Sequence, residues 1–177
     1  LYLAGPPPDV PYIAKETEHR LGRLHAVGLS YCYPGSGRGI EDIDLDLPCG
    51  SFTVVTGRVG SGKTTLLRVL LGLLPRDAGE VWWNGERVAE LATTLQPPRS
   101  AYAAQVPALL SASLRENILL GLPERAVDLQ GAVHRAVLES DVKALDHGLD
   151  TLVGPRGIRL SGGQVQRTAA ARALGGG

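Results

Sequence analysis

Residues 57–64 read Gly-Arg-Val-Gly-Ser-Gly-Lys-Thr and fit the pattern G-x-x-x-x-G-K-[ST] of a phosphate-binding loop. The six residues before it, 51–56, are apolar and β-branched, which predicts a buried strand. Residues 65–74 are mostly leucine and valine and predict a largely buried helix. Strand, glycine-rich loop and helix together are the context that the pattern requires. The alternative is a glycine-rich turn between two buried elements, and the two flanking predictions argue against it.

The residue types in this loop suit a bound phosphate chain. Glycines at 57, 60 and 62 let the backbone adopt positive φ angles and bring N–H groups close to an anion at a helix N-terminus. Lysine at 63 supplies a positive charge for the β- and γ-phosphates, and a threonine hydroxyl at 64 suits Mg²⁺. A second threonine follows and can reach the α-phosphate. The predicted nucleotide-binding set is Gly57, Arg58, Val59, Gly60, Ser61, Gly62, Lys63, Thr64 and Thr65.

Composition limits the class of protein. A chain of 177 residues is of single-domain size, and its 44% hydrophobic and 20% charged content is ordinary for a globular domain. The formal net charge is zero, with 18 basic and 18 acidic residues, so no nucleic-acid partner is expected. No run of apolar residues is long enough to predict a membrane span.

The first part of the chain predicts a linker followed by an antiparallel sheet. Residues 1–23 contain Pro-Pro-Pro and a charged run and are expected to be a linker. Strands are expected at 24–33 and at 40–47, where apolar and acidic residues alternate. Residues 80–88 predict a hairpin whose two-residue turn is Asn84-Gly85. A further short strand is expected at 100–104.

The second part of the chain is predicted to be helical. Ser113 and Glu116 form the pattern of a capping box that opens a short helix. Residues 123–145 have helical composition and contain no strand pattern, and an alanine-rich helix is expected at 164–174. The three glycines that follow are expected to end this last helix.

A second anion-binding pattern opens that last helix. Residues 160–164 read Leu-Ser-Gly-Gly-Gln, in which Ser161 can cap the helix while Gly162 and Gly163 let its N-terminus approach a ligand. Alone, the pattern is equally compatible with an ordinary capped helix start. Its occurrence in the same chain as a phosphate loop favours a ligand-binding role.

With both motifs in this order, the chain resembles the nucleotide-binding domain of ATP-binding cassette (ABC) transporters over residues 24–174. The resemblance implies an α/β fold of the P-loop NTPase class, with a RecA-like core. An antiparallel β subdomain would lie on its N-terminal side and a helical signature subdomain would span 113–160. The domain is assigned to residues 24–177 and is expected to be incomplete at its C-terminus.

The resemblance also implies roles that spacing alone does not give. Tyr33 matches the aromatic residue that stacks on adenine, with Tyr31 as the other candidate. Gln105 matches the glutamine that contacts Mg²⁺ and the attacking water, so Lys63 and Gln105 are the expected catalytic residues and Thr64 and Gln105 the expected metal ligands. Ser161, Gly162, Gly163 and Gln164 are expected to act on ATP bound by a second nucleotide-binding domain in a head-to-tail dimer.

Two further segments resemble the exporter subgroup of this family. They are 109–118, which follows Gln105, and 148–157, which precedes Leu-Ser-Gly-Gly-Gln at 160–164, the signature motif of the family. Pro155 stands where exporters usually carry a glutamate, so this loop departs from the subgroup pattern. In the family, a strand ending in an Mg²⁺-binding aspartate follows, then a catalytic glutamate and a switch histidine. None of these is found in this sequence. The chain is therefore expected to be a fragment that lacks the Mg²⁺-binding (Walker B) aspartate and the glutamate that acts as general base.

The function implied is that of an ATPase domain which couples ATP binding and hydrolysis to transport. It would lie at the cytoplasmic face of the cell membrane, with a transmembrane domain as partner, possibly in the same chain. One alternative is an ABC ATPase acting on DNA or ribosomes. No long coiled-coil, zinc-binding or basic insertion of the kind found in those proteins is present here. The other alternative is a nucleotide-binding module without turnover.

Overall fold

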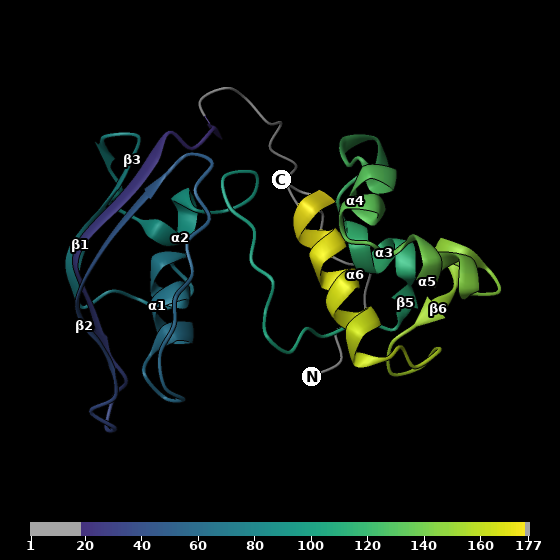
Figure 1. The fold of residues 1–177 in the computed structure, drawn as a ribbon, viewed down its shortest axis with the longest axis horizontal. Helices are drawn as coiled ribbons and strands as arrows, with labels where there is room; N and C mark the ends of the chain where they lie inside the picture. Colours follow the sequence, from purple (N-terminus) through teal and green to yellow (C-terminus); the bar gives the residue numbers. More distant parts are fainter. Residues whose placement is uncertain (1–18, 176–177) are drawn as a thin grey trace. The chain divides into compact units, whose positions relative to one another are not determined.

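The computed structural model describes residues 19–175, which fall into two compact units, 19–100 and 101–175 (Figure 1). The predicted linker at 1–23 lies mostly outside the described residues, as do the last two glycines. The expectation of a mixed α/β chain is confirmed, and each unit has a core of its own.

The N-terminal unit is built on an antiparallel sheet with strand order β2-β1-β3-β4. The strands span Arg23–Cys32 (β1), Gly39–Pro48 (β2), Ala78–Trp83 (β3) and Glu86–Arg87 (β4), close to the predicted ranges. In the β3–β4 turn, Asn84 and Gly85 both have positive φ, 55° and 86°, as a type I′ turn requires. The Asn84 side chain also accepts hydrogen bonds from the backbone of Gly22 and Arg23, which ties the turn to the start of β1.

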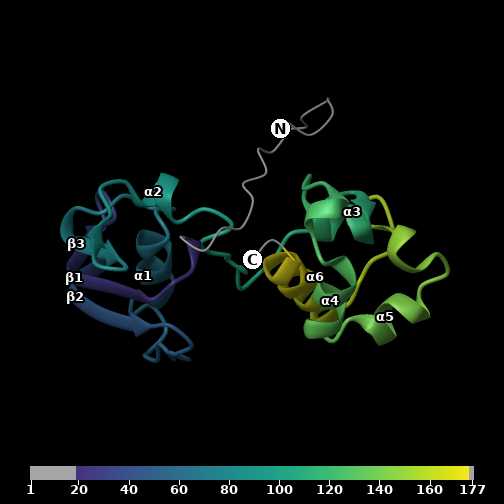
Figure 2. The same ribbon diagram turned by 90° about the horizontal axis from the view of Figure 1, so that it is seen from above.

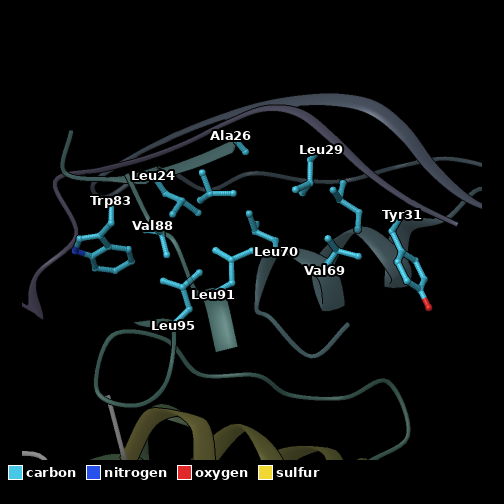
Figure 3. Close-up of a cluster of buried hydrophobic side chains, with 12 residues drawn as sticks. Leu24, Ala26, Leu29, Tyr31, Val69, Leu70, Trp83, Val88, Leu91 and Leu95 are labelled. Atoms are coloured by element: carbon cyan, nitrogen blue, oxygen red, sulfur yellow. The ribbon is translucent and has the colours of Figure 1, made fainter. Parts of the chain in front are cut away.

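One face of this sheet is covered by two helices, α1 (Lys63–Leu70) and α2 (Leu91–Thr94) (Figures 1 and 2). Alternate residues of β1 point inward, so that Leu24, Ala26 and Leu29 are buried. Figure 3 shows these side chains meeting those of Val69 and Leu70 from α1. Leu66, near the start of α1, belongs to the same core, so α1 is packed against the sheet along its length and the phosphate loop precedes a fixed helix.

The prediction of a helix over 65–74 is correct in type but wrong in extent. Helix α1 ends at Leu70, because Gly72 takes a positive φ of 68° and the chain turns there. A Cβ at Gly72 would lie 2.3 Å from the backbone nitrogen of Ala92, so the turn brings two backbones together. Thr65, Leu66, Val69 and Leu70 are buried, whereas Leu67 and Leu73 are exposed.

The prediction of a buried strand at 51–56 is wrong. This segment has no regular secondary structure and pairs with no strand, and Phe52 is 93% exposed. Apolar, β-branched residues favour a strand only when another backbone segment is available for hydrogen bonding on their flank. Within residues 19–100 the four strands pair with one another and none pairs with this segment. The short strand expected at 100–104 is also absent, and those residues are irregular and largely exposed for the same reason.

The C-terminal unit is mainly helical and lies around one long helix, α6 (Gly162–Gly175). This helix packs against α3 (Leu114–Leu119) and α4 (Leu129–Arg135), as Figures 1 and 2 both show. The predicted capping box of α3 is present, because the side chains of Ser113 and Glu116 each bond the other's backbone nitrogen. The remaining elements are β5 (Ala112–Ser113), η2 (Glu124–Ala126), α5 (Glu139–Ala144), η3 (Gly148–Asp150) and β6 (Leu152–Val153).

The helical unit is larger than the predicted helical subdomain at 113–160. Its core includes Ala171 from α6, together with Leu114 and Ile118 from α3 and Val133 from α4. Helix α6 is thus the central helix of this unit and does not lie after it, as the predicted boundary at 160 implied. None of the helices within residues 19–175 combines the length and apolar character needed to cross a bilayer.

Candidate nucleotide-binding site

The phosphate loop has the backbone geometry that its glycines predict. Gly57, Gly60 and Gly62 all have positive φ, at 153°, 82° and 89°. A Cβ on Gly62 would lie 2.8 Å from the carbonyl oxygen of Gly39, so the loop approaches β2 more closely than any other residue type permits. Gly62 also precedes the first turn of α1, and no side chain caps that helix. The first N–H groups of α1 therefore have no partner within the helix and lie at its positive end.

Lys63 folds back over the loop. Its Nζ donates to the carbonyl oxygens of Gly57 and Arg58, both at 2.8 Å, and contacts Ser61 Oγ at 3.4 Å. The ammonium group is thereby held at the N-terminus of α1, where an anion would also be attracted. A phosphate at this position would meet a positive charge and a set of backbone N–H groups together.

A pocket of about 560 Å³ joins this loop to the chain that follows β1. Tyr33 is half-buried at its edge, and the Thr65 hydroxyl lies 3.4 Å from the Tyr33 hydroxyl. Tyr31, the alternative adenine contact, is buried in the core and meets Tyr33 edge-on with ring centroids 4.9 Å apart. The pocket is lined by Tyr33, Pro34, Ser36, Arg38, Gly39, Gly60, Ser61, Gly62, Lys63, Thr64 and Thr65.

Arg38 and Ser36 are pocket residues that the sequence analysis missed. They lie in the turn between β1 and β2, and Arg38 adds a second positive side chain to a pocket that already contains Lys63. The Pro34–Gly35 turn signal is visible in the sequence. What the sequence does not give is the direction of this turn, which folds toward the phosphate loop because the Gly39 backbone packs against Gly62.

The donor groups suit Mg²⁺ only in part. Thr64 is exposed at the pocket and offers a hydroxyl oxygen, a ligand type that Mg²⁺ accepts. Residues 19–175 contain no group of three or more histidine, cysteine or acidic side chains arranged to hold a metal ion. A magnesium ion here would take most of its ligands from phosphate oxygens and water, as is usual at nucleotide sites.

The signature residues lie in the C-terminal unit, at the start of α6. Ser161 and Gln164 bond reciprocally: the Ser161 hydroxyl accepts from the Gln164 nitrogen at 3.3 Å, and Gln164 Oε1 accepts from the Ser161 nitrogen at 2.8 Å. The predicted cap is therefore present, and Gln164 completes a capping box. Ser161, Gly162 and Gly163 are exposed, and no atom would lie within 4 Å of a Cβ on Gly162.

A carboxylate that the sequence analysis did not identify holds this helix start in place. Asp141 of α5 accepts from Gln164 Nε2 at 3.2 Å and from Arg167 Nε at 2.8 Å. The hydrogen bond from the Arg167 guanidinium lowers the pKa of Asp141 below its usual value. Because Asp141 is more than twenty residues away in the chain, no local pattern could have revealed this pairing.

Gln105 belongs to the same unit as the signature. It is exposed, and its backbone carbonyl oxygen accepts a hydrogen bond from Gln166 Nε2 at 3.2 Å. The structure thus brings the phosphate loop together with Tyr33 in one unit, and Gln105 together with α6 in the other.

Comparisons with known proteins show the family to which this chain is related. A family model described as ABC transporter matches residues 40–176. The ATP-dependent lipid A-core flippase of Methylococcus capsulatus is 39% identical over 140 residues, which cover 78% of this chain and 23% of that protein. A probable multidrug resistance ABC transporter ATP-binding/permease protein of Bacillus subtilis is 34% identical over 148 residues, covering 82% of this chain and 25% of that protein.

Human ATP-binding cassette sub-family C member 8 is 35% identical over 148 residues, 76% of this chain and 9% of that protein. This chain thus spans a quarter or less of the length of these three curated relatives. Among solved structures, a bacterial Atm1-family ABC exporter with ATP bound superimposes with a TM-score of 0.75 at 26% identity. The match covers 94% of this chain and 29% of that one.

Proposed function

This chain belongs to the ABC transporter family and carries its ATP-binding domain, and from that premise we propose that it couples ATP binding and hydrolysis to export across a membrane. The observation that supports this proposal most is the pocket in which a glycine cradle, two cations and Tyr33 converge. Relatives named as a lipid flippase, a multidrug resistance transporter and an Atm1-family exporter favour the export direction.

In the proposed mechanism, the N-terminal unit holds one nucleotide. Tyr33 stacks on the adenine ring, and the N–H groups of the phosphate loop and the first turn of α1 bind the phosphate chain. Lys63 exchanges its bonds to the Gly57 and Arg58 carbonyls for bonds to phosphate oxygens. Thr64 would supply one ligand to Mg²⁺, which would neutralise charge on the phosphate oxygens. Phosphoryl transfer requires positioning and charge from the protein more than covalent chemistry, and these residues provide both.

The C-terminal unit serves the nucleotide held by a second copy or a homologous domain. The α6 N-terminus, with Ser161, Gly162 and Gly163 exposed, would approach the γ-phosphate on the partner. Apart from this role on the partner's nucleotide, Gln105 would contact Mg²⁺ and the attacking water. Gln164 acts within its own chain, because both ends of its amide are already bonded to Ser161 and Asp141. A transmembrane domain, in the same or another chain, is the second partner, and places this domain at the cytoplasmic face of the membrane.

The experiment that tests nucleotide binding removes the loop cation. We expect Lys63→Ala to weaken Mg-ATP binding at least about tenfold, because a charge-assisted contact to phosphate is lost. Titration with a fluorescent ATP analogue measures this effect. Lys143→Ala is the matched control, since Lys143 is exposed on α5 in the other unit. Equal affinity of the two variants would exclude Lys63 from the site and overturn the proposed mechanism.

A second measurement tests turnover. Phosphate release by the full-length native protein should stop in Lys63→Ala and persist in Lys143→Ala. ATP binding without any release in the unmodified protein would favour a nucleotide-binding module without turnover.

A further inference from the structure

Asn117 is the most deeply buried side-chain amide in the C-terminal unit, with 0% of its surface exposed. Its Oδ1 accepts from the Leu110 nitrogen at 2.8 Å, and its Nδ2 donates to the carbonyl oxygens of Leu110 and Ser113, both at 3.0 Å. A buried amide is costly unless its groups are paired, and here donor and acceptor are both paired with backbone. Asn117 therefore fixes the path of the chain from Leu110 to Ser113, immediately before α3.

Arg172 of α6 also donates hydrogen bonds to the backbone near Asn117. Its Nε donates to the Asn117 carbonyl oxygen at 2.9 Å, and its Nη2 to the Ala108 carbonyl oxygen at 3.4 Å. Within residues 19–175, no acidic side chain forms an ion pair with it. Burial lowers the pKa of this guanidinium, yet an arginine stays charged in proteins. A half-buried cation is thus stabilised by backbone carbonyls alone, one of which lies in the last turn of α3.

Gln166 gives the third contact, from its side chain to the Gln105 carbonyl oxygen. Gln166 and Arg172 are six residues apart on α6, which is about 9 Å along a helix. Residues 105 and 108 are three apart, about 10 Å in an extended chain. These two lengths match, so the segment after Gln105 runs beside α6 in the same direction and is bonded to it at both ends.

We propose that Asn117 and Arg172 are positioning residues that hold residues 105–113 against α6, so that Gln105 and the signature at Ser161 move as one body. This inference rests on the proposed function for its catalytic consequence. Neither residue contacts nucleotide in the proposed mechanism. Their effect is to transmit a displacement of the segment after Gln105 to the N-terminus of α6, through direct bonds rather than through the phosphate loop.

The test measures amide hydrogen exchange by mass spectrometry in the 177-residue chain and its variants. Arg172→Met keeps the length and apolar stem of the side chain and removes its donors. We expect exchange in residues 106–113 to become at least about tenfold faster, since these amides lose the contacts that order them. Arg172→Lys should give a smaller increase, because a single ammonium cannot reach both carbonyls in the geometry of a guanidinium.

Arg135→Met is the matched control. Arg135 also donates to a backbone carbonyl of α6, that of Leu174 at 3.1 Å, but no contact joins it to residues 105–113. It should leave exchange in that segment unchanged. If Arg172→Met folds and its exchange in 106–113 equals that of Arg135→Met, the inference is overturned. If Arg172→Met does not fold, the same comparison is made with Arg172→Lys and decides the matter in the same way.

A second readout separates positioning from general stability. In the full-length native protein, Arg172→Lys should lower kcat for ATP hydrolysis severalfold and leave KM for ATP unchanged, because the pocket lies in the other unit. A rise in KM with unchanged kcat would contradict the positioning role. Absence of ATP hydrolysis in the unmodified protein would overturn the proposed function instead, while the exchange experiment would still decide the inference.

Discussion

The two helix N-termini that carry the candidate site are built in opposite ways. At α1 the preceding residue is Gly62, in the left-handed region and without a side-chain cap. At α6 the preceding residue is Ser161, whose hydroxyl caps the helix and whose backbone is bonded by Gln164. The first arrangement leaves backbone N–H groups available to a ligand, and the second satisfies part of them within the protein.

This difference indicates how the work is divided between the units. An uncapped N-terminus with a neighbouring lysine suits tight, continuous contact with phosphates. A capped N-terminus anchored by Asp141 suits a surface that must hold its shape before its ligand arrives. In the first case backbone conformation creates the site, and in the second a network of side chains creates it.

The largest expected effect follows from exchanging glycine for alanine at each terminus. Gly62→Ala should abolish detectable ATP binding and destabilise the N-terminal unit by about 1–3 kcal/mol. A Cβ there meets the Gly39 carbonyl, and the φ of 89° is unfavourable for alanine. Gly162→Ala has open space around its Cβ and should leave stability and ATP binding unchanged. Thermal unfolding and nucleotide titration of both variants measure the contrast, and equal behaviour would contradict it.

The next effect concerns the anchor of α6. Asp141→Asn removes the ion pair with Arg167 and should destabilise the C-terminal unit by about 1–2 kcal/mol, because the side chain is only 15% exposed. ATP binding by the phosphate loop should not change. Urea unfolding followed by a probe in each unit distinguishes the two outcomes. A loss of stability confined to the N-terminal unit would show that the network is not what holds α6.

The same carboxylate predicts a pH dependence. The pKa of Asp141 is lower in the folded chain than in the unfolded one, so the stabilisation it gives is complete above the unfolded value of about 4 and is lost as pH falls further. Asp141→Asn should lose this acid-dependent component. Unfolding curves between about pH 5 and 2 would reveal it, and parallel curves for variant and parent would be the contrary result.

A smaller effect separates the two tyrosines of the N-terminal unit. Tyr33→Ala should weaken ATP binding by about 1–2 kcal/mol, the scale of one base–aromatic stack, and Tyr33→Trp should be tolerated. Tyr31→Ala should instead lower stability, because Tyr31 is buried in the core of the N-terminal unit. If Tyr31→Ala remains folded and has the larger effect on affinity, the assignment of the adenine contact must move to Tyr31.

The smallest effect is expected for the cap itself. Ser161→Ala should reduce the stability of the C-terminal unit by about 1 kcal/mol and leave ATP binding to the isolated chain intact. In the full-length protein it should reduce ATP-driven dimerisation. Weaker ATP binding by the folded, monomeric variant would contradict a role on the partner's nucleotide.

Local patterns predicted much of the fold. The alternation in 40–47, the Asn84-Gly85 turn and the Ser113–Glu116 capping box are each confirmed because each depends on neighbours in the sequence. The strand predicted at 51–56 failed because a strand also needs a partner, and partners are a property of the whole sheet. The prediction treated apolar, β-branched composition as sufficient.

The residues of the candidate site fall into the same two groups, those that a local pattern predicts and those that depend on distant contacts. The backbone geometry of the phosphate loop could be predicted, because eight consecutive residues carry both its glycines and its lysine. Arg38, Asp141 and Arg172 could not, since their roles arise from contacts with segments far along the chain. The resemblance to ABC transporters singled out Tyr33 and Gln105, which no local pattern would have distinguished from other tyrosines and glutamines.

The exposed segment at 51–56 has a consequence for how this chain behaves in solution. Phe52, Val54 and Val55 are all exposed, and no strand of the sheet pairs with this segment. Such a segment is adhesive toward any other extended chain, including its own copies. With a net charge of zero, no long-range repulsion keeps the molecules apart. The colloidal stability of this chain therefore depends in part on whether those six residues are covered.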